Sequence, residues 1–129
     1  MSAEGVVLDA SAVLALINQE PGSEVVEGAL QGASISAVNL SEVAGKLIDR
    51  GMSEADARRA LDSLQLPVHD FDRDMAYAAA GLRKRIPSHL GLGDRACLAL
   101  ARVMGAVAMT ADAEWAMVKV RGLAVRLIR

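Results

Sequence analysis

The sequence predicts an α/β fold in which a mostly parallel sheet is covered by helices on both faces. Short apolar runs, typical of buried strands, alternate with segments whose apolar residues recur every three or four positions, as in helices. Such alternation is typical of parallel sheets, because a helix returns the chain to the start of the next strand. The length of 129 residues fits a single domain, and we find no internal repeat or linker.

The first half of the chain contains two expected strands and three expected helices. The apolar run 6–8 indicates a buried strand, and the break at 20–22 ends the helix that follows it. Gly32 and Gly51 mark the ends of the next two helices. In order, we expect a strand at 5–8, helices at 10–18 and 23–31, a strand at 34–37 and a helix at 41–51.

Polar caps and prolines mark the boundaries in the second half. Ser53, with Asp56 three residues later, is typical of a helix start. Asp72 is expected to cap a later helix that Pro87 ends, and Pro67 restricts its own segment to the edge of the sheet. In order, we expect a helix at 53–64, an edge strand at 66–68, helices at 72–87 and 92–104, a strand at 106–109, a short helix holding Trp115 and Val118, and a strand at 123–128.

The composition indicates an aliphatic core. Hydrophobic residues make up 53% of the chain, but only Phe71, Tyr77 and Trp115 are aromatic, and we expect Trp115 to pack against the sheet. Cys97 is the single cysteine, which excludes an intrachain disulfide and indicates a small buried core residue. Four methionines are expected to fill the core: Met75, Met104, Met109 and Met117.

The sequence favours a cytoplasmic protein with no membrane partner. No stretch reaches about 18 uncharged apolar residues, no secretory signal is evident, and one cysteine fits a reducing compartment. The net charge of −2 argues weakly against broad nucleic-acid affinity, because such domains tend to be basic. A local acidic pocket with basic surroundings is still compatible with that sum. The basic residues concerned are Arg83-Lys84-Arg85, Arg121, Arg126 and Arg129.

Four acidic residues are expected at the carboxyl edge of the sheet. Asp9 directly follows the first strand, and Asp112 follows the strand at 106–109. Glu42 and Asp94 are expected in the first turns of helices that begin at this edge. Functional sites of parallel α/β sheets lie outside the carboxyl ends of the strands, so the topology predicts that the four acids converge.

Each acid also has an ordinary explanation as a helix cap, but capping does not explain why a buried strand runs directly into Asp9. Two carboxylates about 4 Å apart repel by roughly 4 kcal/mol at an effective dielectric constant of about 20. A convergent group therefore requires protonation or a cation. An all-oxygen site favours Mg²⁺ or Mn²⁺ and supports phosphodiester hydrolysis, although phosphatases and phosphate-accepting signalling domains also use acid pockets.

Four motifs follow one another along nearly the whole chain: VVLDASAVLAL, SAVNLSEVAGKL, LGLGDRACLALA and MTADAEW. Their ordered combination resembles the PIN-domain ribonucleases and, within them, the VapC-type toxins of toxin–antitoxin pairs. The resemblance implies a PIN-like three-layer α/β/α sandwich formed by a single nuclease domain over residues 1–129. It also implies a homodimer, and an antitoxin partner whose tail enters the active groove.

The resemblance also assigns roles to the acids. Asp9, Glu42 and Asp94 match the invariant acids of the family, and Asp112 matches a more variable fourth acid. The family uses these acids to hold Mg²⁺ or Mn²⁺ and to cut single-stranded RNA or RNA loops. From the resemblance and the carboxylate chemistry we predict a metal-dependent endoribonuclease toxin. A metal-activated water should attack the phosphodiester in line, with no covalent intermediate.

Three further polar residues are implicated by the same resemblance. Ser11 matches a small hydroxyl residue that helps arrange the site, and Thr110 matches a polar position beside the fourth acid. Asn39 precedes the second acid by three residues, as in many relatives. His69 and His89 have no second histidine or cysteine at ligand spacing and are expected to be solvent or structural residues.

Two other functions remain open at this point. An aspartyl-phosphate enzyme of the haloacid-dehalogenase kind would use Asp9 as nucleophile. Ser11, however, stands where that family has a second aspartate, and no lysine is convincingly placed. The other alternative is a non-catalytic module that binds a partner protein, which the presence of all four acids argues against.

Overall fold

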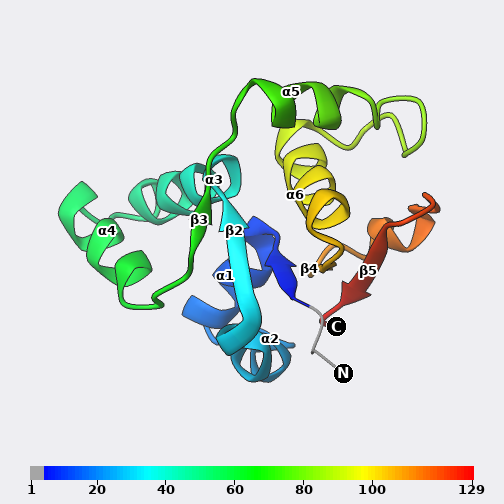
Figure 1. The fold of residues 1–129 in the computed structure, drawn as a ribbon. Helices are drawn as coiled ribbons and strands as arrows, with labels where there is room; N and C mark the ends of the chain where they lie inside the picture. The colour runs from blue at the N-terminus through cyan, green and yellow to red at the C-terminus, as the bar shows by residue number, and fades with distance from the viewer. Residues whose placement is uncertain (1–4) are drawn as a thin grey trace.

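Five parallel strands form the centre of the computed structural model, which describes residues 5–129 (Figure 1). The strand order is β3-β2-β1-β4-β5, and every neighbouring pair is parallel. The predicted α/β class with a parallel central sheet is confirmed. The strands are β1 Val6–Leu8, β2 Ala33–Ser36, β3 Val68–His69, β4 Val107–Thr110 and β5 Ala124–Leu127.

Helices cover both faces of this sheet. One apolar cluster packs α1 to α4 against it, and a second packs α5, α6 and η2 against the opposite face. None of the helices within residues 5–129 is long and apolar enough to cross a membrane. The helices are α1 Ala10–Ile17, α2 Ser23–Ala29, α3 Ala37–Asp49, α4 Glu54–Asp62, α5 Arg73–Ala80 and α6 Leu92–Met104, with 3-10 helices η1 Leu30–Gly32 and η2 Ala113–Met117.

The strand order reverses between β1 and β4. The chain builds β1, β2 and β3 outward in one direction and then returns through α5 and α6 to place β4 on the other side of β1. Leu8 pairs with Met109 across these two strands. The carboxyl ends of β1 and β4 are therefore neighbours at the reversal, which is where open parallel sheets bind ligands.

Helix α3 begins earlier than the sequence predicts. The Ser36 hydroxyl accepts a hydrogen bond from the Val38 N–H (3.2 Å), so the helix begins at Ala37 rather than near Ser41. Glu42 consequently lies in the second turn of α3, and its expected place in the first turn is wrong. The short apolar segment around Ala37 does not distinguish strand from helix by periodicity.

Helix α5 is shorter than expected. It ends at Ala80, and residues 81–86 continue as tight turns in which the N–H of Leu82 bonds the carbonyl of Ala79. Gly81 at the end of α5 is a poor helix former, so the turns tighten there although Leu82 is still buried. The cations at 83–85 are thus exposed on turns rather than on the end of a helix.

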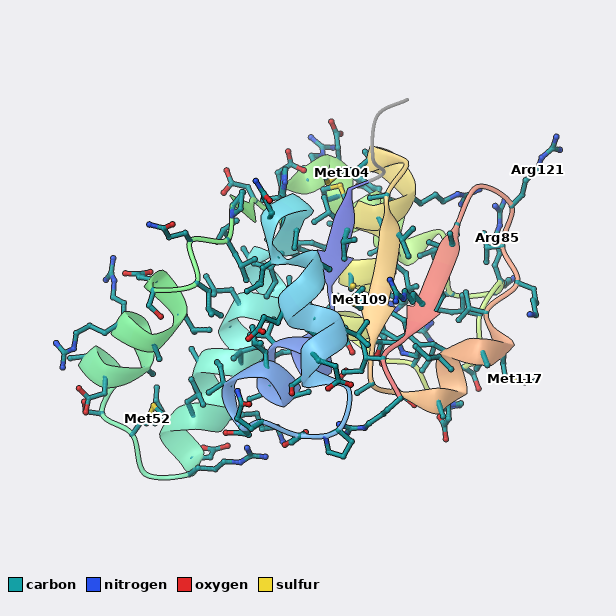
Figure 2. The ribbon with its side chains drawn as sticks, turned by 90° about the horizontal axis from the view of Figure 1, so that it is seen from below. Met52, Arg85, Met104, Met109, Met117 and Arg121 are labelled. Carbon is teal, nitrogen blue, oxygen red and sulfur yellow. The ribbon has the colours of Figure 1, made fainter. Side chains whose placement is uncertain are left out.

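The core is aliphatic, as predicted, with Trp115 and Cys97 both fully buried. Met109 is also buried, but Met104 and Met117 are 44% and 70% exposed, so the prediction that both fill the core is wrong. Each is the last residue of its helix, and both are labelled in Figure 2.

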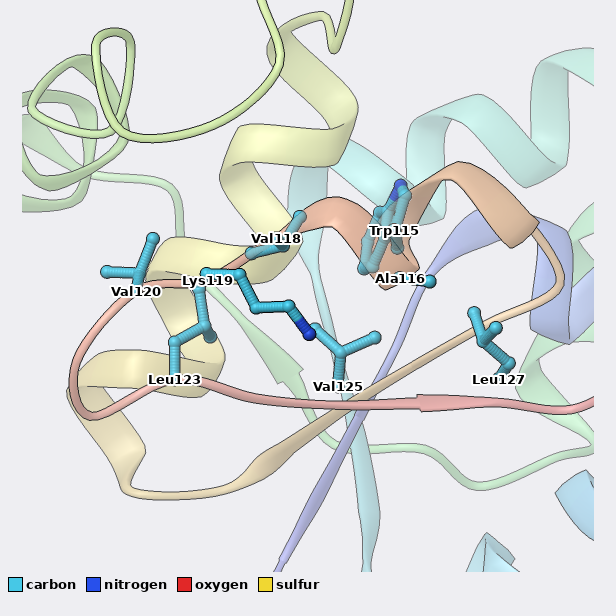
Figure 3. Close-up of a pocket in the computed structure, with 8 residues that line it drawn as sticks. All are labelled: Trp115, Ala116, Val118, Lys119, Val120, Leu123, Val125 and Leu127. Atoms are coloured by element: carbon cyan, nitrogen blue, oxygen red, sulfur yellow. The ribbon is translucent and has the colours of Figure 1, made fainter.

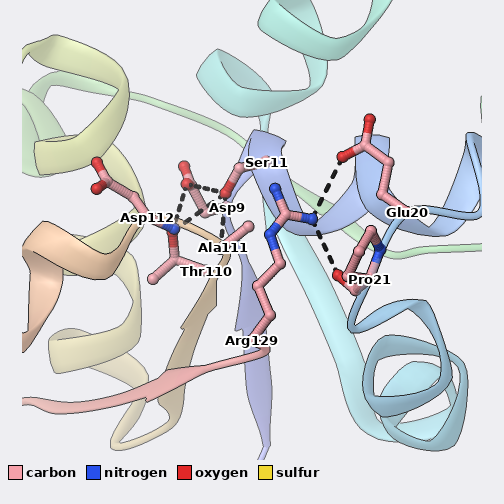
Figure 4. A network of polar contacts seen from close by, with 8 residues as sticks. All are labelled: Asp9, Ser11, Glu20, Pro21, Thr110, Ala111, Asp112 and Arg129. Carbon is pink, nitrogen blue, oxygen red and sulfur yellow. Dashed lines mark hydrogen bonds and ion pairs between the residues drawn. The ribbon is translucent and has the colours of Figure 1, made fainter.

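The last strand is anchored to the turn between α1 and α2. Gly22 adopts a φ of +94°, and a Cβ there would lie 2.5 Å from the carbonyl oxygen of Ile128. Arg129 donates to the Pro21 carbonyl (2.9 Å) and pairs with Glu20 (Figure 4). This contact fixes the end of the sheet that carries β4 and β5.

Candidate active site at the ends of β1 and β4

Asp9 occupies the N-cap position of α1, but its side chain makes no capping hydrogen bond. One carboxylate oxygen, Oδ2, instead accepts hydrogen bonds from Ser11 Oγ (2.8 Å) and Thr110 Oγ1 (2.9 Å) (Figure 4). The Asp9 N–H donates to the Met109 carbonyl (2.9 Å), so strand pairing fixes its backbone. The helix-cap explanation is therefore wrong for Asp9, whose side chain is 6% exposed.

The two hydroxyls that hold Asp9 are fixed in turn by backbone groups. Ser11 Oγ accepts from the Ala111 N–H (2.9 Å), and Thr110 Oγ1 accepts from the Asp112 N–H (3.0 Å). Each hydroxyl has one hydrogen, and both donate to Asp9, so their own 3.1 Å separation is a contact between oxygens. Within residues 5–129 no group donates to Asp9 Oδ1, which leaves that oxygen free to bind a ligand.

The buried position of Asp9 is electrostatically unfavourable. The pKa of its carboxyl is raised from 3.8 to about 6, chiefly by burial and also by the charges of Asp94 and Glu42. The hydrogen bonds from Ser11 and Thr110 lower this pKa without cancelling the effect of burial. A cation bound at this point would relieve the penalty, because it favours the ionised form.

Glu42 is held at the contact between α3 and α6. Asn39 Nδ2 donates to Glu42 Oε1 (2.9 Å) and to the Gly93 carbonyl (3.0 Å), and Asn39 is fully buried. Its amide oxygen has no hydrogen-bond partner within residues 5–129. A Cβ on Gly93 would lie 2.3–2.5 Å from the Glu42 carboxylate, so only glycine leaves room for this side chain.

Asp94 lies in the first turn of α6, as predicted, and its Oδ2 accepts from the Gly91 N–H (3.0 Å). Burial raises the pKa of Asp94, and the charge of Asp112 raises it further. The N–H groups of Gly91 and Trp115 and the charge of His89 lower that pKa. Asp94 thus caps its helix and interacts with other acids at the same time.

Asp112 caps η2 through its Oδ1, which accepts from the Glu114 N–H (2.9 Å). The helix-cap explanation therefore holds for this acid as well as for Asp94. Nearby, the His89 ring pairs with the Glu114 carboxylate and so joins the loop before α6 to η2. This contact gives His89 the structural part that the sequence predicts for it.

The four acids lie at one edge of the sheet and interact in a chain. The charges of Glu42 and Asp94 raise the pKa of Asp9, and the charge of Asp112 raises the pKa of Asp94. Within residues 5–129, however, no three acidic, histidine or cysteine side chains stand close enough to hold a metal ion as they are. The oxygen-only donor set fits Mg²⁺ or Mn²⁺, but the carboxylates must draw closer to hold the ion.

One hollow borders these acids, and a second hollow near them is lined by none of the four. One, of about 490 Å³, lies beside Glu42 and Phe71. The other, of about 540 Å³, lies between η2 and β5, with Trp115 on one side and the Lys119 side chain extended toward Val125 (Figure 3). Trp115 thus lines this second hollow and also acts on the pKa of Asp94.

Comparison with known proteins places this site in a family, because the model of the PIN domain matches residues 6–121. The chain belongs to the PIN domain family. The resemblance to PIN-domain, VapC-type proteins that the motifs indicate is thus confirmed.

This PIN domain has relatives in mycobacteria. It is 32% identical over 110 residues to ribonuclease VapC42 of Mycobacterium tuberculosis. The alignment covers 77% of this chain and 84% of the relative. A VapC ribonuclease of Mycobacterium bovis gives the same values.

Solved structures show the same fold. VapBC2 of Rickettsia felis, bound to a DNA fragment from its promoter, matches with a TM-score of 0.72 and 18% identity over 95% of this chain and 97% of that chain. DNA-bound VapBC of Salmonella typhimurium matches with a TM-score of 0.74 and 16% identity over 98% and 100%. The PIN-like α/β/α sandwich expected from the motifs is therefore confirmed.

Two features of the site in this PIN domain escape sequence reasoning. Gly93 admits the Glu42 carboxylate, and the glycine directly before Asp94 in the motif LGLGD was the available signal. Phe71 reaches the hollow beside Glu42 from the loop before α5, and nothing in the sequence links these two residues. Both depend on how α3 and α6 meet, which periodicity does not reveal.

Proposed function

We propose that this chain is a divalent-metal-dependent endoribonuclease and the toxin of a toxin–antitoxin pair, with residues 1–129 as one nuclease domain. The observation that carries the proposal is the buried Asp9 carboxylate, which faces a strong desolvation penalty and interacts with two further acids. A nearby cation would favour the ionised form of such a group and offset its burial. The relatives named as VapC ribonucleases support RNA as the substrate.

Asp9, Glu42, Asp94 and Asp112 would hold Mg²⁺ or Mn²⁺, directly or through waters. When bound, the ion would supply a Lewis acid that neutralises charge on the phosphate and acidifies a water. Asp9 would fix the position of the ion, because its backbone and one of its oxygens are already immobilised. Glu42 would reach the ion from α3, and the hydrogen bond from Asn39 orients its carboxylate.

A water molecule is the expected nucleophile. The hydroxyls of Ser11 and Thr110 both donate to Asp9, so neither is free to attack a phosphate. Both therefore act as positioning residues in this proposal. Direct attack by water leaves no covalent intermediate on the protein.

The proposed partners are an RNA substrate, an antitoxin protein and a second copy of the chain, all in the cytoplasm. The antitoxin is supported by the solved structures of similar fold, which are VapBC complexes. The homodimer rests on the family resemblance alone. The order of genes around this one offers a direct check, since an antitoxin gene is expected beside it.

Cleavage of RNA by the wild-type protein and by Asp9→Asn tests the function. Total cellular RNA is incubated with Mn²⁺, with Mg²⁺ or with a chelator, and the new RNA ends are mapped. We expect defined cuts only with the wild type and metal, while circular dichroism shows that the variant is folded. Full activity of Asp9→Asn would defeat the assignment.

The same preparations separate the two alternative functions. An acid-labile phosphoaspartate on Asp9 would indicate the dehalogenase-type enzyme, which the two hydroxyl contacts to Asp9 and the serine at position 11 disfavour. A melting temperature that does not respond to Mn²⁺ would indicate a non-catalytic binding module. A metal-binding nuclease should instead melt at a higher temperature when Mn²⁺ is added.

A further inference from the structure

The hollow beside Glu42 has the volume and position of a binding subsite. It measures about 490 Å³ and lies between the first turns of α3, the start of α6 and the loop that precedes α5. Because Glu42 forms part of its wall, any group bound there lies next to the carboxylate site.

The lining of this hollow suits an uncharged group. Among the residues that line it, Glu42 is the only charged one, and no lysine or arginine contributes. A phosphate would therefore be repelled here unless a cation were present. Phe71 and Leu92, the latter 51% exposed, supply apolar surface, and Ser41 adds a hydroxyl.

Phe71 is the aromatic side chain available at this edge. Trp115 is fully buried in the core, and Tyr77 is 67% exposed on α5 with the Arg73 guanidinium 5.9 Å from its ring centre. Phe71 is only partly buried and faces the hollow. Its ring packs partly against the core cluster, and the part that lines the hollow offers a stacking surface for a flat, neutral partner.

We propose that an unpaired nucleobase of the substrate RNA enters this hollow and stacks on Phe71, while an adjacent phosphate lies at the carboxylates. This proposal rests on the ribonuclease function proposed above and adds the part of the RNA that the site binds. The RNA backbone is anionic and meets the acids only through a cation, whereas a base carries no charge and meets no such repulsion. Stacking tolerates any base, so the contact supplies affinity more than sequence preference.

A substitution series on Phe71 tests the stacking. A short RNA that spans the mapped cleavage site is cut with Mn²⁺ by Phe71→Leu, Phe71→Tyr and the control Tyr77→Leu, which removes the other exposed aromatic ring. We expect kcat/KM to fall about tenfold in Phe71→Leu and to stay within about twofold in the other two. Equal losses in Phe71→Leu and Phe71→Tyr would overturn the proposal, because tyrosine also stacks.

An abasic RNA series identifies the stacked base. Removal of one base next to the cut should lower kcat/KM about tenfold for the wild type and should have no further effect on Phe71→Leu. If the loss from base removal and the loss from Phe71→Leu multiply at every RNA position, no base stacks on Phe71. Circular dichroism of each variant excludes misfolding as the cause of a loss.

A binding measurement separates failure of this subsite from failure of the nuclease function. RNA carrying the fluorescent base 2-aminopurine is titrated with the Asp9→Asn variant. We expect its fluorescence to be quenched by this variant but not by the double variant that also carries Phe71→Leu. Quenching without cleavage by the wild type would refute the nuclease function and leave the subsite standing. Unchanged RNA kinetics in Phe71→Leu, with weaker inhibition by an antitoxin, would assign the hollow to a protein side chain and overturn the proposal.

Discussion

The two sides of the carboxylate site are built in opposite ways. Asp9 is almost completely buried and is held by two hydroxyls and by strand pairing. Glu42 is exposed and is held by the amide of Asn39. The comparison teaches that the site combines one immobile carboxylate with one exposed carboxylate that is free to move toward it, and in the proposed function the first would position the cation.

This division also separates stability from activity. On the buried side, ionised Asp9 destabilises the fold, so changes there should alter the free energy of unfolding as well as the chemistry. On the exposed side, Glu42 lies in water and costs the fold little, so changes there should alter activity while the fold remains stable. Four substitutions test that contrast.

The largest effect on stability is expected at Asp9. Without divalent cations, Asp9→Asn should raise the free energy of unfolding by up to about 3 kcal/mol near pH 8, because it removes a buried charge. The pKa of Asp9 is about 6 in the folded protein against 3.8 for the free side chain, so the folded state binds the proton more tightly. Wild-type stability should therefore fall as the pH rises through this interval, as urea denaturation with a chelator would measure.

The control for this prediction is Asp112→Asn, which changes an acid at the same edge that caps η2. It should not reproduce the gain. A difference between wild type and Asp9→Asn that stays constant from about pH 4 to about pH 8 would contradict the role given to burial.

The next effect is expected at Gly93, on the exposed side. Gly93→Ala places a Cβ within 2.5 Å of the Glu42 carboxylate, and the flexible glutamate must swing away. Cleavage should fall on the order of 100-fold, because small displacements of catalytic groups are costly, while stability changes little. Gly45→Ala, with no atom within 4 Å of the new Cβ, is the matched control on α3. Normal cleavage by Gly93→Ala would mean that the position of Glu42 is unimportant.

Thr110 offers a smaller test of the buried side. Thr110→Val removes a donor to Asp9 and the acceptor for the Asp112 N–H. Affinity for Mn²⁺, measured by calorimetry, should weaken roughly 10- to 100-fold, as is usual when a group that supports a metal ligand is lost. Thr110→Ser keeps the hydroxyl and should bind Mn²⁺ nearly as the wild type does. Equal affinity in Thr110→Val would contradict the idea that the hydroxyls orient Asp9.

The smallest effect is expected at Trp115. Its buried indole nitrogen has no full hydrogen-bond partner within residues 5–129, so its N–H is left to act on Asp94, whose pKa it lowers. Trp115→Phe should raise the pKa of Asp94 slightly and shift the pH dependence of Mn²⁺ binding upward. It should destabilise the fold by about 1–2 kcal/mol, much less than the roughly 3–5 kcal/mol expected for Trp115→Ala. An unchanged pH dependence in Trp115→Phe would show that the indole does not act on Asp94.

The sequence predicts the buried side of this comparison well. Asp9 interrupts an apolar strand, and Asp94 and Asp112 follow signals of helix starts, so the rule for parallel sheets is enough to place all three at one edge. The contact between Ser11 and Thr110 joins residues 99 positions apart. The family resemblance implicates each residue separately, but neither it nor a local pattern predicts that the two hydroxyls meet.

The exposed side was harder to predict. Glu42 lies a turn later in α3 than expected, since Ser36 rather than a later residue caps the helix. Asn39, Gly93 and Phe71 come together only when α3, α6 and the loop before α5 are packed, and side-chain packing between helices leaves no period in the sequence. The adjacent position of β1 and β4 is likewise a property of topology, which alternating strands and helices leave open.

The direct pairing of β1 with β4 has a consequence for folding during synthesis of the chain. About a hundred residues separate Leu8 from Met109, its partner across the sheet, so this closure is among the most non-local events in folding. A nascent chain that is still attached to a ribosome and has not released β4 cannot assemble the pocket around Asp9. If the proposed function holds, synthesis of the polypeptide is thereby separated in time from cation binding, and a truncated product that ends before Thr110 should be inactive.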